Sequence, residues 1–135
     1  MLLPTRPDVA APRQVEQARV AWVDTDAGGR IHFTAAFRWA EVTETALFRR
    51  LGLPDQGSYP RRVVKAEFLS VLRFEDELEV ELVPERVGTT SIGYVWEIRR
   101  HGEVCVRGSH TVVHVDDEGR PAPLEAGARR LLSGG

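Results

Sequence analysis

The chain has 135 residues, of which 42% are hydrophobic, and its formal net charge at pH 7 is -2. This length suffices for one buried core, and the weak negative charge argues against a general affinity for nucleic acid or anionic membranes. The single cysteine excludes a disulfide within the chain and favours a cytoplasmic setting, while no apolar run is long enough for a signal peptide or a membrane span.

The amino-terminal part divides into a leader and a first strand. Residues 1–13 contain three prolines and little periodicity, so we expect a loose leader before a single folded domain at 14–135. Apolar and polar side chains alternate along residues 17–23, which predicts a strand. The following segment, DTDAGGRIHF at 24–33, begins with residue types that favour loops and ends the strand.

Residues 34–51 contain no glycine or proline and predict a long helix. Its polar residues recur at spacings of three and four, and so form one narrow stripe composed of Thr34, Arg38, Glu41, Thr45 and Arg49. Most of the other positions are apolar. We therefore expect other elements to cover this helix on most sides.

The rest of the chain reads mainly as strands. Alternation predicts four, at 63–69, 77–83, 91–99 and 103–115, and a short helix is expected at 124–132. Short connections between strands imply an antiparallel sheet, and only a curved sheet can cover so apolar a helix. The predicted fold class is α+β, with one curved antiparallel sheet wrapped around one long helix.

This order, with DTDAGG between the first strand and the helix, resembles the hot-dog fold of the 4-hydroxybenzoyl-CoA thioesterase family. Three further segments are similar to that family: FRWAEVTETALFRRLGL as its central helix, FLSVLRFEDELEVE at 68–81 and VGTTSIGYVWEIRR at 87–100. The resemblance covers roughly residues 15–118. It implies hydrolysis of acyl-CoA thioesters by a homodimer or homotetramer, with active sites at subunit interfaces and neither metal nor cofactor.

The resemblance also implies roles for residues in the loop. The catalytic carboxylate of the family falls on Asp26, and the backbone N–H that holds the thioester carbonyl falls at or near Phe33. A thioester has a good leaving group, so a carboxylate acting as base or nucleophile and an oxyanion site are its main needs. Gly28 and Gly29 would let substrate approach the backbone closely. The structural alternative for Asp26 is an Asx-turn or a helix cap.

Two neighbours of Asp26 have roles of their own to consider. Asp24 ends the predicted strand, and we expect its carboxylate to accept loop N–H groups and fix the turn. Relatives often have Tyr or His at the position of Phe33, whereas here the imidazole lies one residue earlier, at His32. Two roles stay open for His32: it polarises water or the carbonyl, or it hydrogen-bonds within the loop.

Another branch of hot-dog thioesterases uses a glutamate on the helix, which makes Glu41 and Glu44 the reserve candidates. Glu41 belongs to the polar stripe, where solvation or an ion pair is the default. Glu44 borders the apolar side of the helix. It is the stronger of the two.

Cationic side chains at strand ends are candidates for binding the phosphates of CoA: Arg61, Arg62, Lys65, Arg99 and Arg100. His110 and His114 would lie about 13 Å apart on one strand, too far to share a metal ion. Two alternatives remain: a hydroxyacyl-thioester dehydratase, for which no paired histidine and acid is found, and a non-catalytic acyl-CoA binding module.

Overall fold

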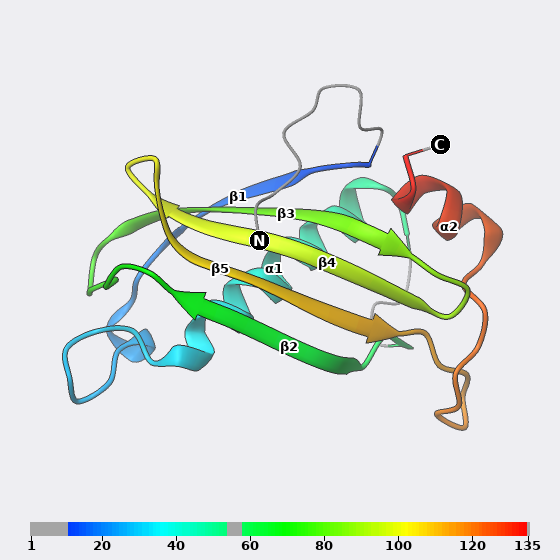
Figure 1. Ribbon diagram of the computed structural model, residues 1–135, viewed down its shortest axis with the longest axis horizontal. Helices are drawn as coiled ribbons and strands as arrows, with labels where there is room; N and C mark the ends of the chain where they lie inside the picture. Colours follow the sequence, from blue (N-terminus) through cyan, green and yellow to red (C-terminus); the bar gives the residue numbers. More distant parts are fainter. Residues whose placement is uncertain (1–10, 54–57, 135) are drawn as a thin grey trace.

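The computed structural model describes residues 11–53 and 58–134. Five strands form one antiparallel sheet in the order β1-β3-β4-β5-β2 (Figure 1). The elements in chain order are β1 (Gln14–Arg19), the 3-10 turn η1 (Trp22–Asp24), α1 (Phe33–Arg50), β2 (Arg61–Phe68), β3 (Glu77–Val87), β4 (Ser91–Arg100), β5 (Glu103–Val113) and α2 (Ala126–Leu132).

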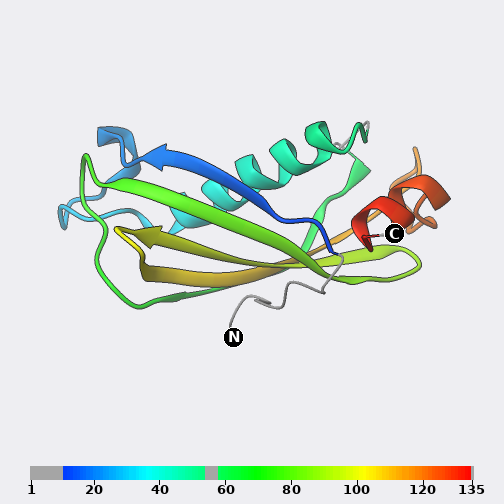
Figure 2. The same cartoon turned by 90° about the horizontal axis from the view of Figure 1, so that it is seen from above.

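The long helix α1 lies across one face of the curved sheet, and the shorter helix α2 lies at one end of it (Figure 2). The central strand β4 supplies much of the core, because its alternate side chains Ile92, Tyr94, Trp96 and Ile98 are fully buried toward α1. The predicted α+β architecture, a curved antiparallel sheet on one long helix, is confirmed. No helix within the described ranges is long and apolar enough to cross a membrane.

Local signals define the ends of α1. His32 precedes the helix with an extended backbone (φ -66°, ψ 140°) and accepts a hydrogen bond from the Thr34 N–H, as a capping residue does. The helix stops at Arg50, and Gly52 then adopts a φ of +71°. The predicted helix at 34–51 differs from the observed one by a single residue at each end.

The prediction for the first strand was wrong in its bounds. It was expected at 17–23, but β1 ends at Arg19, and the chain turns at Trp22–Asp24. The carboxylate of Asp24 accepts a hydrogen bond of 2.8 Å from the Ala21 N–H and so bends the backbone. As a result Trp22 is 76% exposed. Residues 1–10 of the expected leader lie outside the described residues.

The helix α1 is covered on fewer sides than its composition predicts. It packs against β1, β3 and the buried face of β4, and Glu44 contacts Arg61 of β2, while a cavity opens between its first two turns and Val64 of β2. Phe33 on that helix is exposed, as are Val64 and Phe68 on the edge strand β2.

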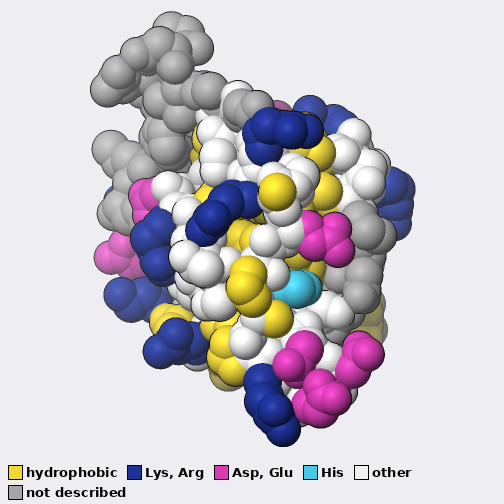
Figure 3. Space-filling model, turned by 90° about the vertical axis from the view of Figure 1, so that its right-hand side faces the viewer, with side chains coloured by type: hydrophobic (Ala, Val, Ile, Leu, Met, Phe, Trp, Pro, Cys, Tyr) yellow, Lys and Arg dark blue, Asp and Glu magenta, His cyan; other side chains and the backbone are white. Residues whose placement is uncertain are grey.

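The end of the molecule near α2 has basic and acidic side chains interspersed with apolar ones (Figure 3).

Candidate active site

The site is built on the loop between η1 and α1, which folds back on itself as a small hairpin. The His32 N–H donates to the Asp24 carbonyl at 2.8 Å, and the Asp26 N–H donates to the Arg30 carbonyl at 2.9 Å. Gly29 lies at the tip with φ +78°, a conformation that a side chain would strain. The loop therefore holds Asp26 a fixed distance before the start of the helix.

Asp26 is exposed, and its two carboxylate oxygens differ. Oδ1 accepts a hydrogen bond of 2.8 Å from the Gly28 N–H, which is the Asx-turn named above as the alternative role. Within the described residues Oδ2 has no hydrogen-bond partner. The turn thus orients the carboxylate and leaves one oxygen available to a water molecule or a substrate.

The carboxylate of Asp24 accepts a backbone N–H at the turn, as predicted. It is buried, accepts the Ala21 N–H and forms an ion pair with Arg38 of α1. This pair fastens the loop to the helix. Both carboxylate oxygens are engaged, and the side chain is only 5% exposed.

The amino-terminal turn of α1 has an unpaired donor. His32 Nδ1 accepts the Thr34 N–H at 3.3 Å, and the imidazole stacks on the ring of Phe33 with centroids 4.7 Å apart. In the described part of the chain the Phe33 N–H has no acceptor. It lies at the positive end of the helix dipole, so it suits a developing negative charge.

Three cavities surround this segment. Asp26 lines one of about 640 Å³ with Trp22 and Phe74, and His32 lines another of about 520 Å³ between α1 and β2. Phe33 lines a third, of about 320 Å³, with Arg30 and Phe68. The chain therefore places Asp26 and Phe33 in two different hollows rather than in one closed pocket.

The reserve candidate Glu44 lies inside the core. It is fully buried, receives hydrogen bonds from Arg61 and contacts His110 Nε2 at 2.9 Å. Trp96 Nε1 lies 3.2 Å from His110 Nδ1. Because an indole N–H can only donate, Nδ1 must accept, and Nε2 then holds the proton and donates to Glu44.

This network corrects one expectation from the sequence. A histidine and an acid do form a pair, Glu44 and His110, although none was found in the sequence. Both ring nitrogens of His110 are occupied and the pair is closed to solvent, so it offers no base to a dehydratase substrate. Glu44 acts as a buried counter-ion rather than as an accessible catalytic group.

The electrostatics of Glu44 follow from its partners. Burial alone would raise its pKa, but the hydrogen bond from His110, together with the hydrogen bonds and charge of Arg61, outweighs burial. The pKa of Glu44 is consequently lowered. Tyr94 responds in the opposite direction, because burial and the nearby negative charge of Glu44 raise its pKa well above the ordinary value.

The cationic candidates occupy different surroundings. Arg61 is paired with Glu44 and also lies 3.7 Å from Glu41. Arg62 and Lys65 are exposed on the edge strand β2, and Lys65 lies opposite Ser109 of β5. Only Arg61 of these three lines the cavity shared with His32.

Side chains suited to metal binding do not gather in the described ranges, where no three of His, Cys, Asp and Glu are close enough to hold an ion. His110 is engaged in the core, and His114 Nδ1 lies 3.1 Å from the Ala122 carbonyl. Cys105 is a buried core residue, and burial raises the pKa of its thiol.

A curved antiparallel sheet on one long helix, with a carboxylate loop at the start of that helix, defines the class as hot-dog thioesterases. The family model described as the thioesterase-like superfamily matches residues 20–132. The chain belongs to this superfamily. It is a hydrolase of acyl-CoA thioesters, which confirms the prediction for the family and the reaction.

Two relatives and one solved structure illustrate the similarity. The 1,4-dihydroxy-2-naphthoyl-CoA hydrolase of Synechococcus sp. (strain RCC307) is 29% identical over 122 residues, covering 81% of this chain and 92% of that protein. Its counterpart in Prochlorococcus marinus (strain NATL1A) is 24% identical over 110 residues, covering 71% and 72%. A crystal structure of a 1,4-dihydroxy-2-naphthoyl-CoA thioesterase from Synechocystis has a TM-score of 0.82 at 17% identity, covering 90% and 96%.

Proposed function

We propose that Asp26 is the catalytic carboxylate and that the Phe33 N–H is the oxyanion donor in the hydrolysis of acyl-CoA. The observation that carries this proposal is the pairing of two unsatisfied groups seven residues apart: a carboxylate oxygen of Asp26 and the first N–H of α1. The hairpin loop fixes both relative to the helix. The glycines at 28 and 29 leave the loop without side chains on the approach to Asp26.

Two routes satisfy this arrangement. Asp26 takes a proton from water, which attacks the carbonyl carbon, or Asp26 attacks that carbon itself and forms a mixed anhydride that water then cleaves. In both routes the carbonyl oxygen gains negative charge and the C–S bond breaks to release the CoA thiolate. The Phe33 N–H stabilises that oxygen in each. His32 contributes by capping the helix and so orienting this donor.

For the acyl group we propose a hydroxylated aromatic acid. The relatives named above act on 1,4-dihydroxy-2-naphthoyl-CoA. The cavity between α1 and β2 supports this choice, because apolar side chains of Phe37 and Val64 line it together with hydrogen-bonding groups of Arg38 and Arg61. The ring of a hydroxylated aromatic acid would contact the apolar side chains, and its hydroxyl groups would hydrogen-bond with the arginines.

We also propose that the working form is a cytoplasmic homodimer or homotetramer joined through β2. This strand lies at the edge of the sheet, with Val64 48% and Phe68 46% exposed. An exposed apolar edge favours pairing with another strand, and a second β2 running antiparallel would close it. Light scattering should show a dimer or larger for the unaltered protein and a monomer for Val64→Glu. Val15→Glu, on the opposite edge strand β1, is the matched control and should leave the assembly intact.

Thiol release from a panel of acyl-CoA esters tests the catalytic assignment. We expect Asp26→Asn to lower kcat about 10²–10⁴-fold, because the amide can neither accept the proton of water nor attack the carbonyl. The variant should fold normally, since an asparagine oxygen can still accept the Gly28 N–H. Asp117→Asn, at an exposed aspartate of another loop, serves as the control. Full activity of Asp26→Asn would remove Asp26 from its role, and an unaltered protein inactive on every ester would favour a binding module.

A further inference from the structure

Several arginines expected to bind CoA phosphates have their charge neutralised by carboxylates of the same chain. Arg61 is paired with Glu44, and Arg100 with Asp76 and Glu103. Arg99 contacts three glutamates at once, Glu79, Glu81 and Glu97. A guanidinium held in this way offers little net charge to a phosphate. Cations without such partners are therefore better suited to bind a phosphate.

Arg30 and Arg73 are the clearest cations of this kind near the site. They lie directly opposite each other in an antiparallel bridge, and both are exposed. In the ranges that the structure describes, neither guanidinium has a carboxylate partner. Asp76 accepts the backbone N–H of Arg73, but its charge is shared with Arg100.

The placement of Arg30 directly opposite Arg73 is electrostatically unfavourable unless an anion binds to them. Directly opposed residues of an antiparallel pair project from the same face with Cβ atoms about 5 Å apart, and like charges there repel. The backbone holds the two arginines in place, since the Ile31 N–H donates to the Leu72 carbonyl at 3.0 Å. A bound anion would turn the repulsion into two favourable contacts.

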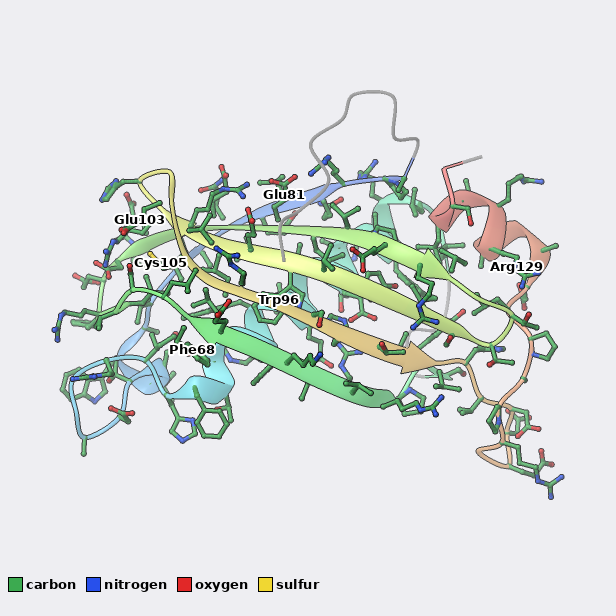
Figure 4. The ribbon with its side chains drawn as sticks, in the orientation of Figure 1. Phe68, Glu81, Trp96, Glu103, Cys105 and Arg129 are labelled. Atoms are coloured by element: carbon green, nitrogen blue, oxygen red, sulfur yellow. The ribbon has the colours of Figure 1, made fainter. Side chains whose placement is uncertain are left out.

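A groove is shared by Arg30 of this pair and by Phe33. The cavity of about 320 Å³ is lined by Arg30, Phe33 and the largely apolar segment 68–72, and Arg73 follows this segment directly, opposite Arg30. Figure 4 labels Phe68 at the end of β2, beside the first turn of α1. The groove thus offers an apolar wall beside Arg30 and Phe33, with Arg73 at the end of that wall.

We propose that Arg30 and Arg73 bind the phosphate groups of the CoA moiety, while its pantetheine arm follows the groove to the thioester at Phe33. This inference rests on the proposed function, because it takes Phe33 as the place of the thioester. Guanidinium groups suit phosphates well, since each can donate two parallel hydrogen bonds to one phosphate. The pair selects CoA esters over thioesters that lack phosphates.

The test compares an acyl-CoA ester with the N-acetylcysteamine thioester of the same acid, which carries no phosphate. We expect Arg30→Gln and Arg73→Gln each to raise KM for the CoA ester about tenfold, with kcat little changed, and to leave KM for the short thioester unaltered. Raising the salt concentration should weaken the binding of the CoA ester by the unaltered protein more than by the double variant.

Arg129→Gln is the matched control, because Arg129 lies on α2 at the opposite end of the sheet (Figure 4). Arg62→Gln and Lys65→Gln test the residues named from the sequence. An unchanged KM in both Arg30→Gln and Arg73→Gln would overturn the proposal, as would an equal rise for the two thioesters, which would indicate a structural role. Loss of the Asp26 assignment alone would appear as full activity of Asp26→Asn and would leave the KM pattern as it is.

Discussion

His110 and Glu44 share a hydrogen bond of 2.9 Å inside the core, although 66 residues separate them in the chain. Trp96 Nε1 donates to Nδ1 of His110, Nε2 contacts Glu44, and Arg61 pairs with the same carboxylate. The network joins α1 to β5 and to the edge strand β2. The buried carboxylate of Glu44 therefore links α1, which begins at the proposed active site, to β2, the proposed dimer edge.

Replacing Glu44 tests how far this network stabilises the fold. Glu44→Gln keeps the size of the side chain but leaves the guanidinium of Arg61 without its buried counter-ion. We expect the free energy of unfolding to fall by about 2–4 kcal/mol, measured by urea denaturation at one fixed protein concentration. Glu41→Gln, one helical turn away with its side chain 58% exposed, should change it by less than about 0.5 kcal/mol. Equal losses in the two variants would contradict the prediction.

The same variant gives a pH prediction. The pKa of Glu44 is lowered in the folded protein from an ordinary value of 4.5. Between the two pKa values the unfolded chain binds the proton and the folded protein does not, so stability rises with pH there. The stabilisation is complete above the unfolded pKa and is lost as pH falls through the folded pKa.

The measurement is the difference in unfolding free energy between the unaltered protein and Glu44→Gln across a pH series. This difference should be constant above about pH 5 and should shrink below it. Other carboxylates, including Glu81, whose pKa is also lowered, titrate in both proteins and cancel. A difference that does not shrink in acid would show that the charge of Glu44 contributes nothing.

The elements that the sequence predicts well are those with strong local patterns. Alternation along β4 and the absence of breakers in α1 placed these two elements to within one residue at each end, because periodicity reflects which face is buried. The start of β3 was also correct, but the strand continues to Val87, four residues beyond the predicted end. The bounds of β1 were wrong because a single hydrogen bond, from the Ala21 N–H to Asp24, ends the strand before its alternation does.

The candidate site was predictable only where a contiguous motif encodes it. Asp24 and Asp26 lie in one short loop, and their neighbours along the chain define their surroundings. The partners of Glu44 come from distant strands, and the pairing of Arg30 with Arg73 depends on the register of an isolated bridge. Neither pair of residues is marked by a regular spacing in the sequence. Both contacts could therefore be identified only from the folded structure.

His32 caps the amino terminus of α1, and this role can be tested. Its Nδ1 accepts the Thr34 N–H, which an asparagine oxygen could also do. We expect His32→Asn to keep kcat within about twofold and His32→Ala to lower the free energy of unfolding by about 1 kcal/mol. Thiol release and urea denaturation measure the two effects. A large loss of kcat in the asparagine variant would instead show that the imidazole takes part in the chemistry.

We expect that the proposed oxyanion donor, the Phe33 N–H, can be removed without disturbing the helix. Phe33 is the first helical residue, where proline is favoured because the N–H there is unpaired, and His32 before it already has the extended backbone that a following proline requires. Phe33→Pro should therefore fold, with kcat lowered about 10²–10³-fold. Phe33→Ala retains the N–H and controls for loss of the aromatic ring. Equal values of kcat for Phe33→Pro and Phe33→Ala, with circular dichroism confirming that both fold, would show that the oxyanion is stabilised elsewhere.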